Sequence, residues 1–246
     1  MTPPDLDNRI SGKINAISGN REPITGTLEE ALKAVPRHLF VPSVGLALAD
    51  DGPVLIDWGG DPDAWWAAVD GTAAIVTQLE EGATALRATE GRYNCSSSAL
   101  GTVVRLLGPL NPQPGHRVLE GGTGTGWTAA LLSHLVGEDG SVTSIEVDEG
   151  LGEQAAKSLA AVGAQPHLIV GDGAAGCPDR APYDRVHVTC GIHTVPYAWI
   201  QQAAPGAVVV APLLTFFRPG CQARPGSVVE MAVERWDVSH RFRAGG

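Results

Sequence analysis

The stretch RVLEGGTGTGW, at positions 117–127, decides the fold. Its apolar start, Val118 and Leu119, is typical of a buried strand, and a helix is expected from about Trp127 to Val136. The glycines between them allow positive φ and let the backbone approach a ligand closely. Free N–H groups at the start of the helix favour an anionic or polar ligand group. The stretch therefore predicts a strand, a ligand-binding turn and a helix.

The same alternation continues through the rest of the chain. Short apolar runs separated by helical segments indicate βαβ units, and hence a doubly wound parallel sheet of the Rossmann-like α/β class. A helix is expected at 152–162, and the further strands are expected at 142–147, 167–170, 185–189, 207–211, 228–234 and 238–242.

Acidic residues follow the first three expected strands. Glu120, Glu146 and Asp172 lie at the carboxyl ends of these strands, the edge where open α/β sheets bind ligands. Glu146 is placed to accept from ribose hydroxyls, with Asp148 as a competitor. Asp172 is placed to accept from an adenine amine, with Gly173 leaving room for the ring. For each carboxylate the alternative is a helix cap.

The glycine loop alone leaves the nucleotide open. Gly124-x-Gly126-x-x-Ala129 satisfies a relaxed dinucleotide fingerprint, so both NAD and S-adenosylmethionine fit it. A NAD-dependent oxidoreductase would also need a Tyr-Lys or His-Asp pair for hydride transfer, and no such arrangement is evident.

The N-terminal region is less regular. It predicts helices at 27–35, 64–69 and 99–107 and a strand at 73–79, with a short apolar run at 54–56. We expect one globular unit, in which residues 1–110 form an accessory, substrate-covering layer and residues 111–246 form the cofactor-binding core. Trp58, Trp65 and Trp66 are expected in the core of that layer, with a lid over a peptide groove as the alternative.

Composition and charge argue against several classes of binding partner. The 246 residues carry a net charge of −10 and are 43% hydrophobic, without a basic patch, an apolar membrane span or a targeting segment. We therefore expect a cytoplasmic protein that binds neither nucleic acid nor membrane. The spacing of Cys95, Cys177, Cys190 and Cys221 predicts neither a disulfide framework nor a metal site. His187 and Cys190 face opposite sides of their strand, so no metal is expected there either. The oligomeric state is not predicted.

Five motifs, in order, resemble the protein-L-isoaspartate O-methyltransferase family. They are VPRHLFVP at 35–42, the serines at 96–98 ahead of a helix, VLEGGTGTGW at 118–127, GDG at 171–173 and APYD at 181–184. The resemblance covers about residues 30–212. It implies S-adenosylmethionine as cofactor and esterification of an Asp or isoAsp side-chain carboxylate in a peptide or protein.

The resemblance also implies roles for single residues. Matching the family's Thr-x-Ser-x-Pro-His segment to Ser96–Gly101 makes Ser98 the catalytic, carboxylate-contacting residue, although Leu100 and Gly101 replace the Pro and His. Residues 189–199 are similar to a branch that acts on ribosomally made peptides, and Thr189, Cys190 and His193 join Ser98 as substrate-binding residues. The implied cofactor-binding residues are Ser96, Ser97, Glu120, Gly122, Thr123, Gly124, Gly126, Glu146, Asp172 and Gly173.

The expected reaction needs no protein base, because a carboxyl group with a pKa of about 4 is already ionised at neutral pH. The ester would then close to a succinimide. Leu100 and Gly101 replace the Pro and His that shape the cofactor-side wall of the substrate pocket in the family, and the Trp-bearing N-terminal segment offers a surface for further side chains. Both features favour a dedicated peptide that carries an Asp followed by a small residue. The alternatives are general isoaspartate repair and a non-catalytic peptide-binding module, the latter suggested by Leu100 and Gly101.

Overall fold

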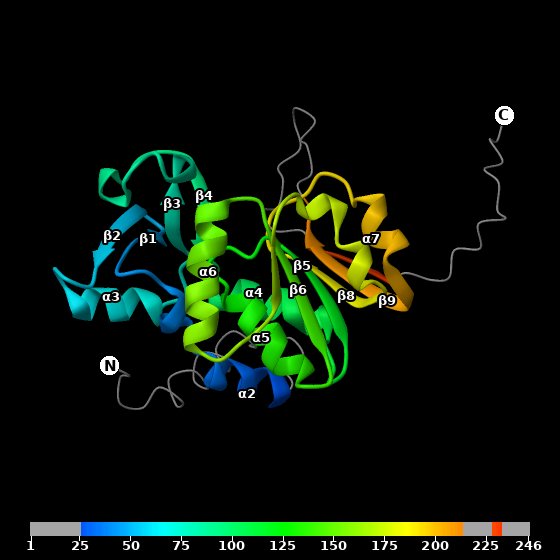
Figure 1. Ribbon diagram of the computed structural model, residues 1–246. Coiled ribbons are helices and arrows are strands. Elements are labelled where there is room, and N and C mark those ends of the chain that lie inside the picture. The colour runs from blue at the N-terminus through cyan, green and yellow to red at the C-terminus, as the bar shows by residue number, and fades with distance from the viewer. Residues whose placement is uncertain (1–25, 214–227, 233–246) are drawn as a thin grey trace.

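The computed structural model describes residues 26–213 and 228–232. Its main body is a six-stranded sheet in the order β10-β9-β8-β5-β6-β7, seen on the right of Figure 1. All neighbours are parallel except β10, which runs antiparallel to β9. The strands are β5 (Arg117–Gly121), β6 (Ser141–Glu146), β7 (His167–Val170), β8 (Tyr183–Val188), β9 (Ala203–Pro212) and β10 (Val228–Ala232). The order confirms the predicted doubly wound fold, and the switch point of the strand order lies between the parallel strands β5 and β8.

Helices cover one face of this sheet. They are α2 (Gly26–Ala34), α4 (Leu100–Leu110), α5 (Trp127–Val136) and α6 (Glu149–Ala161). Helix α6 begins three residues earlier than predicted because the Asp148 carboxylate accepts from the Leu151 N–H and caps it. Helix α4 continues past the predicted end at Leu107, because Leu110 is also fully buried. The opposite face is covered by the short α7 (Tyr197–Gln201), which was not predicted.

A second, antiparallel sheet lies beside the first, at the left of Figure 1. Its order is β2-β1-β3-β4, from β1 (Val44–Ala49), β2 (Gly52–Asp57), β3 (Ile75–Leu79) and β4 (Tyr93–Ser97). Helix α3 (Pro62–Val69) packs on it, and Trp65 lies in their shared core with Trp66 against it. Trp58 is 37% exposed and meets both indoles edge-on. The short 3-10 helices are η1 (Arg37–Phe40), η2 (Glu80–Gly82), η3 (Leu86–Ala88), η4 (Gly173–Ala175) and η5 (Pro178–Arg180).

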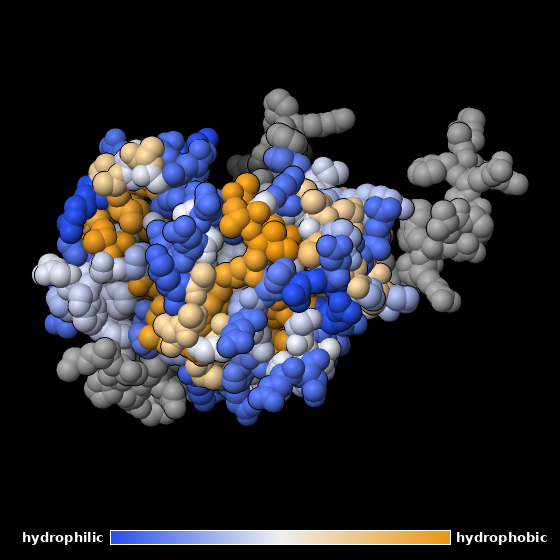
Figure 2. All heavy atoms as spheres, viewed as in Figure 1, coloured by the Kyte–Doolittle hydropathy of each residue, from blue (hydrophilic) through white to orange (hydrophobic). Residues whose placement is uncertain are grey.

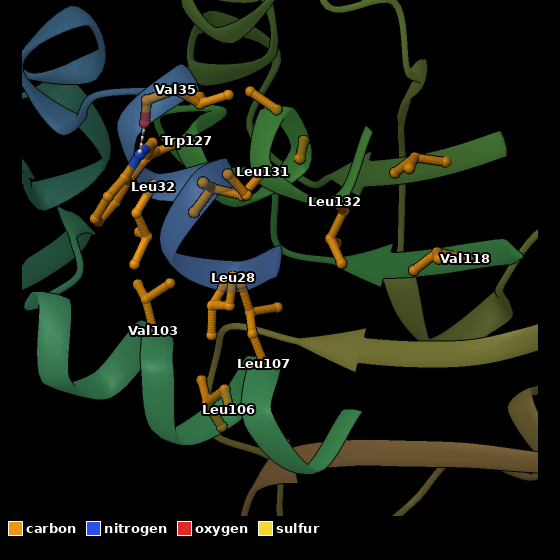
Figure 3. Packing of buried hydrophobic residues seen from close by; sticks show 14 of the residues in the cluster. Leu28, Leu32, Val35, Val103, Leu106, Leu107, Val118, Trp127, Leu131 and Leu132 are labelled. Carbon is orange, nitrogen blue, oxygen red and sulfur yellow. Dashed lines mark hydrogen bonds between the residues drawn. The ribbon is translucent and has the colours of Figure 1, made fainter. Parts of the chain in front are cut away.

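The largest core joins the two halves of the chain. Figure 3 shows α2 and α4 placing leucines and valines against α5 and β5. The indole N–H of Trp127 donates to the Val35 carbonyl oxygen at 2.9 Å, which ties the start of α5 to the end of α2. Two helices of the expected accessory region thus pack directly on the large sheet, and the separate layer runs from β1 to β4. The strand predicted at 238–242 lies outside the described residues.

Candidate functional site

A cavity of about 550 Å³ opens at the carboxyl edge of β5, β6 and β8. The glycine loop and the ends of β6 and β8 form one wall, β4 and the residue after it form a second, and the segment leading into α7 forms a third. The lining residues are Asn94, Cys95, Ser96, Ser98, Gly121, Gly122, Gly124, Ile145, Glu146, Val147, Leu151, Asp172, Gly173, Ala174, Val188, Thr189, Cys190, Ile192, Pro196 and Trp199. The edge predicted from the sequence is therefore the edge that is hollowed.

The glycine loop is held from two sides. The Thr189 hydroxyl donates to the Gly122 carbonyl oxygen at 2.5 Å, and the Gly124 N–H donates to Glu146 Oε2 at 2.8 Å. Gly122 has a φ of +88°, and a Cβ there would lie 2.5 Å from the Thr189 hydroxyl oxygen. Only glycine fits this position. The loop thus presents bare backbone to the cavity.

Glu146 organises the loop while lining the cavity. Besides Gly124, it accepts from the Asp148 N–H through Oε1 at 3.1 Å, and it is 7% exposed. Asp148 is engaged elsewhere: it caps α6 through one carboxylate oxygen and accepts from Gln78 Nε2 of β3 through the other, at 3.2 Å. Between them Val147 is 77% exposed. Figure 2 shows hydrophobic surface gathered on this face beside α6.

Asp172 and Gly173 form a further part of the cavity wall. Asp172 Oδ1 accepts from the Ala174 N–H at 2.9 Å, which caps η4. The carboxylate is nonetheless exposed and lines the cavity. Trp199 Nε1 donates to the Gly173 carbonyl oxygen at 2.8 Å and holds this turn in place. Capping and ligand binding, the two alternatives for Asp172, are therefore compatible.

Glu120 does not reach the cavity. Its side chain is fully buried under the loop and accepts from the Ser144 hydroxyl at 2.6 Å. Ser144 lies 2.6 Å from the Thr123 hydroxyl oxygen, and His187 Nδ1 lies 3.4 Å from Glu120 Oε1. Neither ring nitrogen of His187 has a hydrogen-bond partner among the described residues. Glu120 therefore supports the loop from below, where the sequence predicted contact with the cofactor.

Other predicted residues also lie outside the cavity. Thr123 belongs to the buried row just described, and Gly126, with a φ of +87°, packs against Ala155 and Leu159 of α6. Ser97 is buried and bonded to Arg37. His193, which is exposed, is not among the lining residues.

The serine segment alternates as an extended strand must. Ser96 and Ser98 line the cavity, and Ser97 between them points away to Arg37. Leu100 is 8% exposed in the large core, and neither Leu100 nor Gly101 lines the cavity. The replacements of Pro and His that the sequence placed in the substrate pocket are thus located in the first turn of α4.

Two thiols lie in the cavity wall. Burial raises the pKa of Cys95 to about 11, and the nearby carboxylates of Glu146 and Asp148 act in the same direction against a hydrogen bond with Thr77. Its sulfur would lie 3.4 Å from a Cβ on Gly124. Cys190 is exposed. Within residues 26–213 and 228–232, no group of His, Cys, Asp and Glu is arranged to hold a metal.

The sequence missed several lining residues. Asn94, Val147 and Leu151 belong to no motif. Asn94 reaches the cavity from β4, and Val147 and Leu151 reach it from the segment that follows β6. Only Val147 could have been found from the sequence, because it is an apolar residue directly after Glu146, the carboxylate that ends its strand.

None of the helices the structure describes is long and apolar enough to cross a bilayer.

Comparisons with known proteins show which family the sequence resembles. The family model "Protein-L-isoaspartate(D-aspartate) O-methyltransferase (PCMT)" matches residues 67–218. A protein-L-isoaspartate O-methyltransferase of Methanococcus maripaludis is 30% identical over 86% of this chain and 84% of its own length. One of Aeropyrum pernix is 33% identical over 76% of this chain and 59% of its own length.

Solved structures share the fold. A protein-L-isoaspartate O-methyltransferase has a TM-score of 0.65 at 24% identity, over 85% of this chain and 55% of that one. A Plasmodium falciparum structure, described as a putative member in complex with S-adenosyl-L-homocysteine, has a TM-score of 0.62 at 11% identity, over 91% of this chain and 88% of that one. The chain thus spans more than half of the first and most of the second.

Proposed function

The chain belongs to the protein-L-isoaspartate O-methyltransferase family, and on that premise we propose that it is an S-adenosylmethionine-dependent enzyme. Its proposed reaction is esterification of the side-chain carboxylate of an isoaspartyl or aspartyl residue in a peptide or protein. One observation carries the proposal: a single cavity has the glycine loop, Glu146 and Asp172 on one side and Ser98 on another. The family uses S-adenosylmethionine, which removes the NAD-dependent oxidoreductase from the alternatives.

The residues present fit this cofactor. The cradle at Gly122 would be filled by any Cβ, Glu146 and Asp172 are acceptors for ribose hydroxyls and an adenine amine, and Val147 offers an apolar surface for the ring. The Plasmodium structure described with the demethylated cofactor supports the same choice. Glu120 holds the loop from beneath and is no longer proposed as a contact.

The chemistry divides between cofactor and chain. When bound, S-adenosylmethionine would supply an electrophilic methyl group for a substrate carboxylate oxygen, with the neutral thioether as the leaving group. Ser98 orients the carboxylate through a neutral donor, which leaves its negative charge available for attack. No base is required because the carboxylate is ionised at neutral pH. Turnover should rise with substrate ionisation near pH 4 to 5 and then stay level.

A dedicated peptide substrate is a second candidate. The segment similar to the peptide-modifying branch contributes to the wall of the cavity that Ser98 also lines, and this supports the candidate. Its lining residues are Thr189, Cys190, Ile192, Pro196 and Trp199. In this version a normal Asp is methylated, and the next backbone nitrogen attacks the ester and expels methanol to give a succinimide. We propose that the protein is cytoplasmic, whichever of the two substrates it takes.

Intact-mass measurement tests both versions. The enzyme and S-adenosylmethionine are incubated with an isoaspartyl peptide, its aspartyl counterpart and peptides encoded beside the gene. A gain of one methyl on arbitrary isoaspartyl peptides indicates repair, whereas methylation of an Asp peptide followed by a net loss of one water indicates the dedicated substrate. Cofactor binding without any methylated product would favour the non-catalytic peptide-binding module.

Ser98→Ala tests the serine's role. We expect lower turnover with cofactor affinity nearly unchanged, because its proposed partner is the substrate. Ser133→Ala is the matched control, since the Ser133 hydroxyl donates within α5 to the Ala129 carbonyl oxygen and lies away from the cavity. Equal loss of cofactor affinity and turnover in Ser98→Ala would move Ser98 to the cofactor side.

A further inference from the structure

Arg37, the arginine of the VPRHLFVP motif, has no role in the reaction described above. It is 8% exposed although it carries a charge, and burial lowers the pKa of its guanidinium to about 10, partly offset by the negative charge of Asp70. A buried guanidinium is costly unless its donors are satisfied. The hydrogen-bond partners of the guanidinium therefore indicate its role.

Four hydrogen bonds fix the guanidinium. Nε donates to the Ser97 hydroxyl at 3.1 Å and Nη2 to the Ser97 carbonyl oxygen at 2.8 Å. Nη1 donates to the Val69 carbonyl oxygen at 3.2 Å, at the end of α3, and Nη2 also to the Ala73 carbonyl oxygen at 3.0 Å, before β3. The planar fork thus holds three segments in one arrangement.

The Arg37 side chain also contacts the start of α5, the helix that follows the glycine loop. Its central carbon lies 5.7 Å from the centre of the Trp127 ring, a cation–π distance. Trp127 is the first residue of α5, directly after the glycine loop. Arg37 therefore connects the start of the cofactor-binding helix to the residue that precedes Ser98.

We propose that Arg37 is a positioning residue that acts through Ser98. The Ser97 carbonyl belongs to the peptide unit that joins Ser97 to Ser98, so the bidentate contact fixes the plane from which Ser98 enters the cavity. The guanidinium aligns the substrate-orienting serine with the glycine loop without touching the substrate. This inference rests on the proposed function, and its test separates the two.

The first measurement needs no activity. Cys95 lies in β4 two residues before Ser97 and is 8% exposed. We expect Arg37→Lys, which keeps the charge and loses the fork, to speed alkylation of Cys95 by roughly tenfold through local opening of β4. Arg185→Lys is the matched control, because the partly buried Arg185 Nε donates to the Leu110 carbonyl oxygen, away from the cavity. Equal Cys95 labelling in wild type and Arg37→Lys overturns the proposal.

The second measurement is a double-mutant cycle on methyl transfer. We expect Arg37→Lys to lower kcat roughly 10- to 100-fold with the Kd for S-adenosylhomocysteine within about threefold, and to add little to the loss in Ser98→Ala. Ser97→Ala, which removes one of the four bonds, should show a weaker form of the same pattern and serves if Arg37→Lys does not fold. Additive losses would mean a general structural role and would refute action through Ser98.

An inactive wild type would refute the proposed function alone. The labelling of Cys95 would still decide whether Arg37 holds β4 and the serine segment. An active wild type together with an Arg37→Lys variant of unchanged kcat and unchanged Cys95 labelling would refute the inference alone.

Discussion

Three carboxylates lie at the carboxyl ends of the first three parallel strands, and their surroundings give them different tasks. Glu120 is enclosed with Ser144 and His187, Glu146 is shared between the loop backbone and the cavity, and Asp172 is exposed within the cavity. A carboxylate that keeps its contact with solvent can exchange water for a ligand donor, whereas an enclosed one cannot. Ligand affinity should therefore depend on Asp172 directly and on Glu120 only through the loop.

Asp172→Ala should weaken binding of S-adenosylhomocysteine by about 1 to 3 kcal/mol, because a ligand donor would be left unpaired. Isothermal titration calorimetry measures this change. Asp179→Ala, which removes an exposed carboxylate from η5, is the matched control. An unchanged dissociation constant would mean that Asp172 serves only as the cap of η4.

The Glu120 and His187 side chains should be coupled. His187→Leu leaves the fully buried Glu120 without the polar side chain whose Nδ1 lies 3.4 Å from its Oε1, and it should lower the free energy of unfolding by about 1 to 3 kcal/mol. Adding Glu120→Gln should cost less than the sum of the two single losses, because the two side chains are in contact. Urea unfolding of the wild type, both single variants and the double variant measures the coupling, and strictly additive losses would argue against it.

Cys95 gives the stability of the protein a pH dependence. Its pKa is about 11 in the folded protein against an ordinary 9.0, so the unfolded chain loses the proton first as pH rises. The contribution is fully present below pH 9 and is lost between pH 9 and 11, at up to about 1.4 kcal/mol per pH unit. Cys95→Ala should show a shallower decline over this window. Parallel stability curves for the two proteins would contradict the raised pKa.

At the scale of the elements, the glycine loop requires glycine at position 122 for two reasons: the positive φ and the lack of room for a Cβ. Gly122→Ala combines positive φ with a Cβ 2.5 Å from the Thr189 oxygen, so we expect more than tenfold weaker cofactor binding, the equivalent of about 1.4 kcal/mol. Gly137→Ala is the control: its φ of +68° brings similar strain with nothing within 4 Å. Thermal melts and calorimetric titration separate the two, and equal binding losses would remove the steric argument.

The large sheet could be predicted from the sequence because each strand is a run of apolar residues between breakers. Strands β1 and β4 could not. The exposed Tyr93 and the serines of β4 become a strand only by pairing with β3, and that pairing is a tertiary contact. Likewise, adjacent serines 97 and 98 look alike in sequence, and the strand turns one to Arg37 and the other to the cavity. Glu120 was misplaced because its neighbours come from β6 and β8.

At the scale of the molecule, the two sheets should unfold together. Helices α2 and α4 belong to the core of the large sheet, and Gln78 bonds to Asp148 across the two sheets. We expect one calorimetric transition with equal calorimetric and van't Hoff enthalpies. S-adenosylhomocysteine at a hundred times its Kd should stabilise the whole by about 2.7 kcal/mol. Two separate peaks would show that the antiparallel layer is an independent unit.

The packing of α4 also sets an order of events on the ribosome. This helix is synthesised before any strand of the large sheet, yet it packs against β8 and β9, which leave the exit tunnel some seventy to a hundred residues later. Until then the side of α4 that meets β8 and β9 stays uncovered. The antiparallel layer, built from neighbouring hairpins, can form early, whereas the nascent α4 exposes an apolar face to chaperones and to other chains. Truncations that end before β9 should therefore aggregate even though every residue of the glycine loop is present.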